Sequence, residues 1–352
     1  MTTWNTVFFG LVLLAGSTAL TAHVGAQQTD GNTADTGTPT PSAPTADPDT
    51  DPDTDNSATA GDSATASDSA TESELAEATA ELATEKVELR YRLTPKQELR
   101  YRVEHLATVD TTIEGTQQKT QSRSVSTKVW QIHDSIGDEK FSFSHSIEDV
   151  QMWQEVSGRK PVEYNSRTDK QPPAEYEAVA AQLGKPLADI TIDPTGKIIE
   201  RKDHVPQTDL GFGAITIQLP AGLVGVGTTW ASDAEIRART ESGQYKKVTI
   251  RQKFRLEKIQ TGIATISMRS EVITPVNDAR VRSQIVQRLS QGTIKFDIDA
   301  GHVVSKELEW NESVLAFNGA DSNMKYLARF TETLITEPQT AQRPTAGSSN
   351  SQ

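Results

Sequence analysis

One unit occurs twice in this sequence and constrains the fold more than any other feature. It consists of a helix with one apolar face, a glycine and then a β-hairpin. The two copies span residues 173–201 and 278–309. Helix, glycine and hairpin repeated in the same order indicate internal duplication. The sequence therefore predicts two tandem, related halves.

The helical part of each copy follows from the spacing of apolar residues at three- and four-residue intervals. The two stripes are Tyr176, Val179, Ala180 and Leu183, then Val281, Ile285 and Leu289. Gly184 follows the first stripe at a position suited to a left-handed cap, and Pro186 blocks continuation of the helix. Gly292 is predicted to stop the second helix in the same way.

Each glycine is followed by alternating apolar and polar residues, which is the pattern of a half-buried strand. The alternating apolar residues are Ile190 and Ile192 in the first copy, and Ile294, Phe296 and Ile298 in the second. Turns are predicted at residues 193–196 and 299–301, where Gly196 and Gly301 can supply a positive φ. Each copy therefore ends in a predicted β-hairpin.

The first 26 residues have the pattern of a secretory signal peptide. Residues 7–20 are mostly apolar, and this run is short for a membrane span. Val24-Gly25-Ala26 fits a signal-peptidase site before Gln27, although no Lys or Arg precedes the apolar run. An uncleaved N-terminal anchor is the alternative. Export places the protein in the periplasm or outside the cell.

Charge is unevenly distributed along the 352 residues. The net charge is −13, yet residues 27–85 hold 14 acidic residues and no Lys or Arg. The remainder carries 35 basic and 48 − 14 = 34 acidic residues, a net charge of +1. Such a near-neutral folded part does not favour nucleic acid as a partner. Residues 27–85 are predicted to be a disordered acidic spacer, and alternating Asp51, Asp53 and Asp55 are interpreted as part of it rather than as a calcium loop.

The rest of the chain is predicted to be rich in β-structure. The first half covers residues 86–218, the second covers 219–337, and residues 338–352 form a disordered tail. Strands are expected at residues 87–93, 99–103, 108–127, 129–132, 141–143, 147–156, 234–239, 247–259, 263–273 and 326–336. A turn is expected at 135–139 and another at 260–262. Residues 157–172, which make the first half longer than the second, are interpreted as a solvated loop.

No set of residues stands out as a catalytic, cofactor-binding or metal-binding site. The chain has no cysteine, which excludes disulfides and thiolate ligands. Ser157 and Lys160 match S-x-x-K but lie in the predicted loop. The histidines outside the signal peptide lack metal-ligand spacing; they are His105, His133, His145, His204 and His302. No cofactor is expected.

Two weaker groups of residues remain as candidates. Four acidic residues lie on the second hairpin and can bind a cation or act in acid–base chemistry; they are Asp297, Asp299, Glu307 and Glu309. Four tryptophans can line a ligand cavity, although a core role is favoured; they are Trp130, Trp153, Trp230 and Trp310. The acidic residues are favoured as the solvated face of a half-buried hairpin.

Two stretches of this sequence resemble a family of exported bacterial proteins whose domain has no assigned function. They are EYNSRTDKQPPAEYEAVAAQLGKPLADITIDPTGKIIERK, residues 163–202, and LPAGLVGVGTTW, residues 219–230. The resemblance covers residues 87–336. It implies a signal peptide, a low-complexity spacer and a β-rich domain, and it supplies no catalytic residue. The mixture of strands and helices also resembles, more loosely, the curved half-barrels of periplasmic lipoprotein carriers.

The sequence therefore predicts a mainly β (α+β) protein with curved antiparallel sheets in two tandem related halves, each with a short helix. The leading functional hypothesis is an exported envelope protein that binds an apolar ligand or a protein partner without catalysis. Two alternatives remain: a hydrolase that uses the acidic residues of the second hairpin, and a structural scaffold of the envelope.

Overall fold

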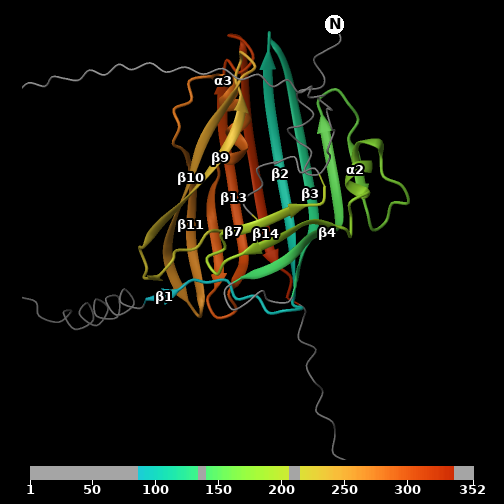
Figure 1. The fold of residues 1–352 in the computed structure, drawn as a ribbon. Helices are drawn as coiled ribbons and strands as arrows, with labels where there is room; N and C mark the ends of the chain where they lie inside the picture. The colour runs from blue at the N-terminus through green and yellow to red at the C-terminus, as the bar shows by residue number, and fades with distance from the viewer. Residues whose placement is uncertain (1–85, 134–139, 206–214, 337–352) are drawn as a thin grey trace, which may run out of the picture. The chain divides into compact units, whose positions relative to one another are not determined.

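The computed structural model describes residues 86–133, 140–205 and 215–336 (Figure 1). These residues are mainly β, with antiparallel strands and two short helical segments, as the sequence predicts. The predicted signal peptide, spacer, tail and turn at 135–139 lie outside the described residues. No helix within the described ranges has both the length and the apolar character needed to cross a bilayer.

One large antiparallel sheet contains twelve of the described strands. Their bounds are β2 Glu98–Ile113, β3 Thr116–Ile132, β4 Phe141–Val156, β5 Val162–Asn165, β6 Pro186–Ile192, β7 Ile198–Asp203, β9 Thr229–Arg239, β10 Tyr245–Gln260, β11 Ile263–Val272, β12 Gln291–Asp297, β13 His302–Leu315 and β14 Ser322–Leu334. The spatial order is β7-β6-β4-β3-β2-β14-β13-β12-β11-β10-β9, and β5 pairs with β4 beside β6. The last described strand, β14, therefore joins the two parts of the sheet by pairing with β2 on one side and β13 on the other.

The order of elements repeats on the two sides of β14. On one side, β3 and β4 pair, a short helical segment follows, and β6 and β7 form a hairpin. On the other side, β10, β11, a helix, β12 and β13 follow in the same way, and both helices connect strands that are neighbours in the sheet. This connectivity is compatible with the predicted duplication, which itself stays a prediction.

Each helical segment ends before the last residue of its apolar stripe, which is Leu183 in the first copy and Leu289 in the second. The first consists of η2 Ala174–Tyr176 and α2 Glu177–Ala180, and the second of α3 Ala279–Ile285 and η3 Val286–Arg288. Gly184 has a φ of 71°, as expected for a residue that turns the chain after a helix.

The predicted role of Gly292 is wrong. Gly292 lies inside β12, after the helix has already ended. A Cβ at this position would overlap the carbonyl oxygen of Glu307, so β13 approaches too closely for any side chain. Glycine is needed here for strand packing and not for a helix cap.

Other strand boundaries also differ from the sequence predictions. Residues 141–143 and 147–156 belong to the single strand β4, in which Glu148 is an extra residue at an irregularity opposite Thr127 and Lys128. The predicted loop 157–172 contains β5. In the predicted strand 87–93, only β1 Val87–Glu88 is a strand, and it pairs with β8 Leu223–Val224 in a separate two-stranded sheet.

The main core covers one face of the large sheet, here called the inner face. Cross-strand pairing and alternation place on this face the buried residues Trp130, Phe143, Leu256, Phe296 and Trp310. The opposite face is called the outer face. α3 packs Val281 and Ile285 on the inner side of β9 and β10, and α2 packs Val179 beside Met152 of β4. Both helices therefore shield apolar strand residues from water.

Irregular segments cover another part of the inner face. Leu89, Tyr91 and Leu93 are buried in the main core although they follow β1 without strand pairing. The Tyr91 N–H donates to the Pro194 carbonyl oxygen at 2.8 Å, and the Arg92 N–H donates to the Gly301 carbonyl oxygen at 2.9 Å. The segment thus binds the turns of both predicted hairpins.

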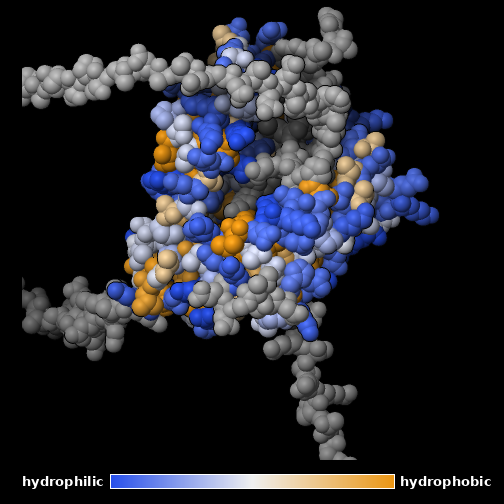
Figure 2. Space-filling view, in the orientation of Figure 1, coloured by the Kyte–Doolittle hydropathy of each residue, from blue (hydrophilic) through white to orange (hydrophobic). Residues whose placement is uncertain are grey.

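Residues 216–219 connect the two ends of the sheet. The Thr216 hydroxyl donates to the Gly196 carbonyl oxygen at 2.7 Å, and the Trp230 indole N–H on β9 donates to the Gln218 carbonyl oxygen at 2.8 Å. Figure 1 shows the sheet curving so that β7 and β9 both lie in front of β14. In the view of Figure 2, the side that carries β4 and α2 is mainly hydrophilic, and apolar residues gather beside β1.

Candidate ligand pocket and buried charge network

The structure does not bring the four acidic residues of the second hairpin together. Asp297 pairs with His302 and its carboxylate accepts hydrogen bonds from the Asp299 and Ala300 N–H groups, so it stabilises the turn. Glu307 lies opposite Thr293, four residues from Asp297 along β12, which is roughly 13 Å. Among the described residues, no group of three or more His, Asp or Glu side chains has a metal-binding arrangement.

The four tryptophans have separate surroundings. Trp130 and Trp310 are buried in the core, and Trp310 donates to the Gln287 carbonyl oxygen at 3.0 Å. Trp230 is partly buried and stacks on Phe254 with ring centroids 5.6 Å apart. Trp153 is the one of the four that lines a pocket of about 500 Å³.

This pocket lies on the outer face of β3, β4 and β5. Cross-strand pairing gives it a platform of two rows: Arg123, Trp153 and Glu163, then Val125, Gln151 and Asn165. These side chains share one face because residues two apart on a strand point the same way. Met152 and Tyr164 also line the pocket, but their side chains pack with Val179 of α2 on the other face, so they contribute main-chain atoms.

The turn after β5 forms one wall of the pocket with Thr168 and Asp169. The Asn165 side-chain oxygen accepts from the Arg167 N–H at 3.0 Å, and the Asp169 carboxylate accepts from the Asn165 N–H at 2.7 Å. The Thr168 hydroxyl donates to the second Asp169 oxygen at 3.0 Å. Local bonds of this kind fix the turn, so the wall is formed without a ligand.

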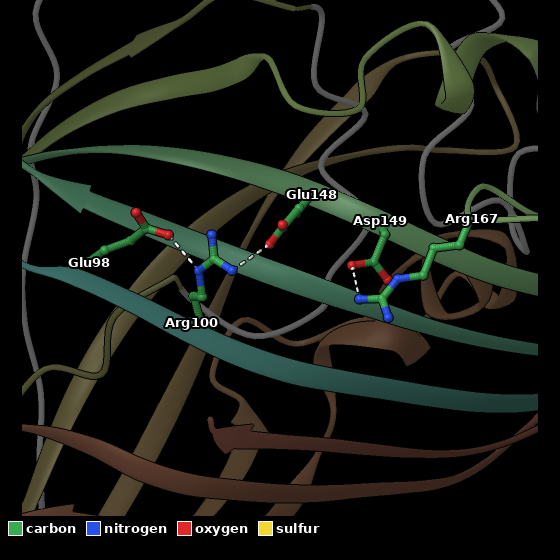
Figure 3. A network of polar contacts seen from close by, with 5 residues as sticks. All are labelled: Glu98, Arg100, Glu148, Asp149 and Arg167. Carbon is green, nitrogen blue, oxygen red and sulfur yellow. Dashed lines mark hydrogen bonds and ion pairs between the residues drawn. The ribbon is translucent and has the colours of Figure 1, made fainter. Parts of the chain in front are cut away.

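Two groups of ion pairs lie near β4, and one of them attaches the turn of the pocket to this strand (Figure 3). Arg167 binds Asp149 at 2.7 Å and so fixes the turn to β4. Between β2 and β4, Arg100 bridges Glu98 at 2.5 Å and Glu148 at 3.2 Å. The three arginine–carboxylate contacts are at least partly exposed, so each contributes little to the free energy of unfolding, and only the Arg167–Asp149 pair restricts the position of the turn.

A second polar group lies within the core. Lys128, Lys306 and Glu332 are 7%, 5% and 4% exposed. One Glu332 oxygen lies 2.5 Å from the Lys128 ammonium, and the other lies 3.3 Å from the Lys306 ammonium. The Lys128 ammonium is also 4.5 Å from the centroid of the Tyr101 ring and 4.9 Å from that of Trp130. We call these three charged residues the buried charge network.

Burial and charge shift the pKa values of this region in opposite directions. Burial lowers the pKa of Lys128 to about 8, although Glu332 opposes this change. Burial alone would raise the pKa of Glu332, but the two ammonium groups outweigh it and hold that pKa below its usual value. Burial, and next Lys128, lower the pKa of His145 to about 3, and burial lowers the pKa of His105 to about 4. At neutral pH both imidazoles are therefore uncharged.

The sequence contains a signal for each of these features. Lys128 is in phase with Trp130 and Ile132 on β3, so alternation places a charge on an apolar face. For the pocket, the signal is a difference in length: 17 residues separate β4 from η2 in the first half, whereas six separate β11 from α3 in the second. The extra residues form β5 and the turn that walls the pocket.

Comparison with known proteins identifies no family. No family model and no curated protein matches the chain. Lipovitellin, in a structure that describes its lipid–protein interactions, is 13% identical with a TM-score of 0.41; the match covers 72% of this chain but only 27% of lipovitellin. The translocator domain of the autotransporter NalP from Neisseria meningitidis is 6% identical with a TM-score of 0.26, covering 75% and 96%. The Salmonella secretin InvG is 11% identical with a TM-score of 0.16, covering 78% and 68%. Likenesses this weak support no inference about function.

Proposed function

We propose that this protein is an exported, non-catalytic binding protein of the cell envelope and that the outer-face pocket holds its ligand. The observation that carries the proposal is a preformed pocket of about 500 Å³ that is lined by Trp153 on the middle one of three strands. Ligand pockets are typically concave and largely preformed, with volumes of about 300–1,000 Å³. Most are lined mainly by apolar and aromatic side chains, whereas here Trp153 and Val125 lie among polar side chains. Export rests on the apolar N-terminal segment and its cleavage-site pattern.

The polar groups of the pocket favour binding over catalysis. The pocket holds two carboxylates, Glu163 and Asp169. Both oxygens of Asp169 accept hydrogen bonds within the turn, from the Asn165 N–H and from the Thr168 hydroxyl. Asp169 is therefore committed to the turn, which leaves Glu163 without a second carboxylate for paired acid–base work. The hydrolase alternative on the second hairpin loses support because those acidic residues lie apart.

The nature of the pocket also narrows the expected ligand. Val125 and Trp153 offer apolar surface, while Arg123, Glu163 and Gln151 offer polar groups on the same platform. A purely apolar ligand would remove water from Glu163 and Gln151 without replacing its hydrogen bonds and would cost binding free energy. We therefore expect a ligand with both an apolar and a polar face.

A second candidate, an apolar ligand on the inner face, is favoured by one observation. Between α2 and the main core, the inner face carries small side chains that are only partly buried: Ser122, Ser124 and Ser126 of β3. The described residues therefore leave these three serines partly accessible on the inner face. Elsewhere the protein's own side chains cover the inner face and form the main core. A solid core of this kind is what the scaffold alternative predicts.

Native mass spectrometry of the full-length protein, purified from the envelope fraction, tests the proposal. We expect an additional small-molecule mass on the wild type and on Tyr245→Ala, and its loss from Trp153→Ala. Tyr245 is a matched control because it is an aromatic residue, 74% exposed, on the distant strand β10. A ligand that remains bound to Trp153→Ala contradicts the pocket assignment, and a lipid mass retained in that variant favours the inner face.

A further inference from the structure

We propose that the outer-face pocket binds a neutral saccharide, with the Trp153 indole contacting the C–H face of a sugar ring. This inference rests on the proposed function, because it names the ligand class of the same pocket. It is carried by the arrangement of side chains on the platform, by the charge of the pocket and by the fixed turn that walls it.

The size of the platform fits one or two sugar rings. It extends across three adjacent strands and two residues of one face along each strand. With strands about 4.8 Å apart and same-face residues roughly 6.7 Å apart, it measures about 10 Å by 7 Å. Trp153 occupies the middle strand and pairs with Arg123 on one side and Glu163 on the other. An aromatic side chain flanked by two polar side chains therefore stands on one face of three adjacent strands.

The hydrogen-bonding groups match hydroxyls better than any single charge. Arg123 is a donor, Glu163 is an acceptor, and the side-chain amide of Gln151 is both. A sugar hydroxyl donates one hydrogen bond and accepts others, so a ring of hydroxyls can use donors and acceptors that lie side by side. An aliphatic or purely aromatic ligand would desolvate Glu163 and Gln151 without offering them hydrogen bonds.

The charge of the pocket disfavours anionic ligands. Arg123 is bound by Glu104, with its guanidinium nitrogens 2.8 Å and 2.7 Å from one carboxylate oxygen. Glu163 and Asp169 then give the lining an excess of negative charge. Phosphates and uronic acids would be repelled, whereas a neutral saccharide carries no such cost.

A cationic peptide is the competing class, because an ammonium group can also bind beside Trp153 and Glu163. Hydrogen-bonding capacity disfavours it. Arg123 pairs directly with Trp153, and although Glu104 offsets its charge, its remaining N–H groups need acceptors. A sugar hydroxyl can accept from them, whereas an ammonium group can only donate.

Isothermal titration of the full-length protein with three sets of probes tests the inference. The probes are neutral oligosaccharides of hexoses and of N-acetylhexosamines, oligosaccharides of uronic acids, and a lysine-containing peptide. We expect binding to at least one neutral oligosaccharide and none to the other sets. Trp153→Ala should weaken that binding at least about tenfold, Trp153→Phe should weaken it less, and Tyr245→Ala should leave it within about twofold.

The outcomes separate the two proposals. Binding of the lysine peptide in place of every saccharide overturns the saccharide assignment, and so does a complete absence of saccharide binding. A Trp153-dependent ligand of another class, found by mass spectrometry, retains the pocket function while removing the sugar. Saccharide binding that is equal in wild type and Trp153→Ala places the sugar elsewhere and contradicts the inference.

Gln151→Ala, which alters an exposed side chain, gives a second variant should Trp153→Ala fail to fold.

Discussion

At the scale of single residues, the least expected feature is a net positive charge within the core. Two ammonium groups share one carboxylate, and all three side chains are less than a tenth exposed. Removing charges from water is costly, and here only one of the two lysines is neutralised by charge. The aromatic rings of Tyr101 and Trp130 supply further stabilisation by facing the Lys128 ammonium. The network therefore depends most on its single anion.

This asymmetry predicts different costs for two substitutions. Glu332→Gln leaves two buried ammonium groups without a carboxylate and should lower the free energy of unfolding by about 3–5 kcal/mol. Lys128→Met leaves the Lys306–Glu332 pair intact, introduces a side chain of similar volume and leaves the network without net charge. It should therefore lower the free energy of unfolding by only about 1–2 kcal/mol, partly because the ammonium contacts with the Tyr101 and Trp130 rings are lost. Urea denaturation of both variants measures the difference. A Lys128→Met variant that is less stable than Glu332→Gln would show that the excess charge is not the dominant cost.

At the scale of elements, the turn between β6 and β7 organises its surroundings. Gly196 has a φ of 80°, and a Cβ there would overlap both the Ile217 carbonyl oxygen and the Tyr91 ring. The turn thus meets the segment after β1 and the segment before β8 at one point. A glycine is required for its backbone conformation and also for this close approach.

A pair of alanine substitutions separates these two requirements. Gly158 has the same φ of 80°, but nothing lies within 4 Å of the position that a Cβ would occupy there. Gly158→Ala should therefore cost about 1 kcal/mol from backbone strain alone. Gly196→Ala should cost at least about 2 kcal/mol more, because Tyr91 and Ile217 must also move. Thermal and urea denaturation measure both values, and equal costs would mean that the packing around Gly196 yields easily.

The elements also show what alternation in the sequence can and cannot predict. Ile190, Ile192, Ile294 and Phe296 are buried on one strand face, as their spacing predicted, and Gly196 and Gly301 have positive φ values. Gly292 was mistaken for a helix stop because its contact with Glu307 is distant in sequence. In the sequence, a glycine that caps a helix cannot be distinguished from one that allows a neighbouring strand to approach closely. Only the strand pairing separates the two roles.

At the scale of the whole molecule, the class of fold was predictable but the pocket was not. The strands could be found locally, whereas the pairing of β14 with β2 joins residues more than 200 positions apart. The pocket depends on β3, β4 and β5 lying in register, which places Arg123, Trp153 and Glu163 in one row. In the sequence, Arg123 and Trp153 lie in two separate predicted strands and Glu163 lies in the predicted loop 157–172, so no local pattern places the three side by side. Long-range pairing, and not composition, creates the candidate site.

The stability of the molecule should depend on pH through its buried groups. The pKa values of His105 and His145 are lowered from 6.5 to about 4 and about 3, chiefly by burial. Below about pH 6.5 the unfolded chain binds a proton at each histidine, while the folded protein does not until far lower pH. Glu332 acts in the same direction, because its lowered pKa contributes stability that is lost as pH falls below its usual value of 4.5. His105, His145 and Glu332 therefore all lower the free energy of unfolding as the pH falls.

The free energy of unfolding should consequently fall as pH is lowered from 7 to 4. Each histidine contributes a slope of at most about 1.4 kcal/mol per pH unit below pH 6.5. Urea denaturation at pH 7, 6, 5 and 4 measures the slope, and constant m-values confirm that the same transition is compared. His145→Leu removes one titrating group and should reduce the slope even if it changes the stability at pH 7. A free energy of unfolding that stays constant between pH 7 and 5 would contradict this prediction. It would mean that both imidazoles bind protons in the folded protein, which requires solvent to reach the inner face beside Lys128.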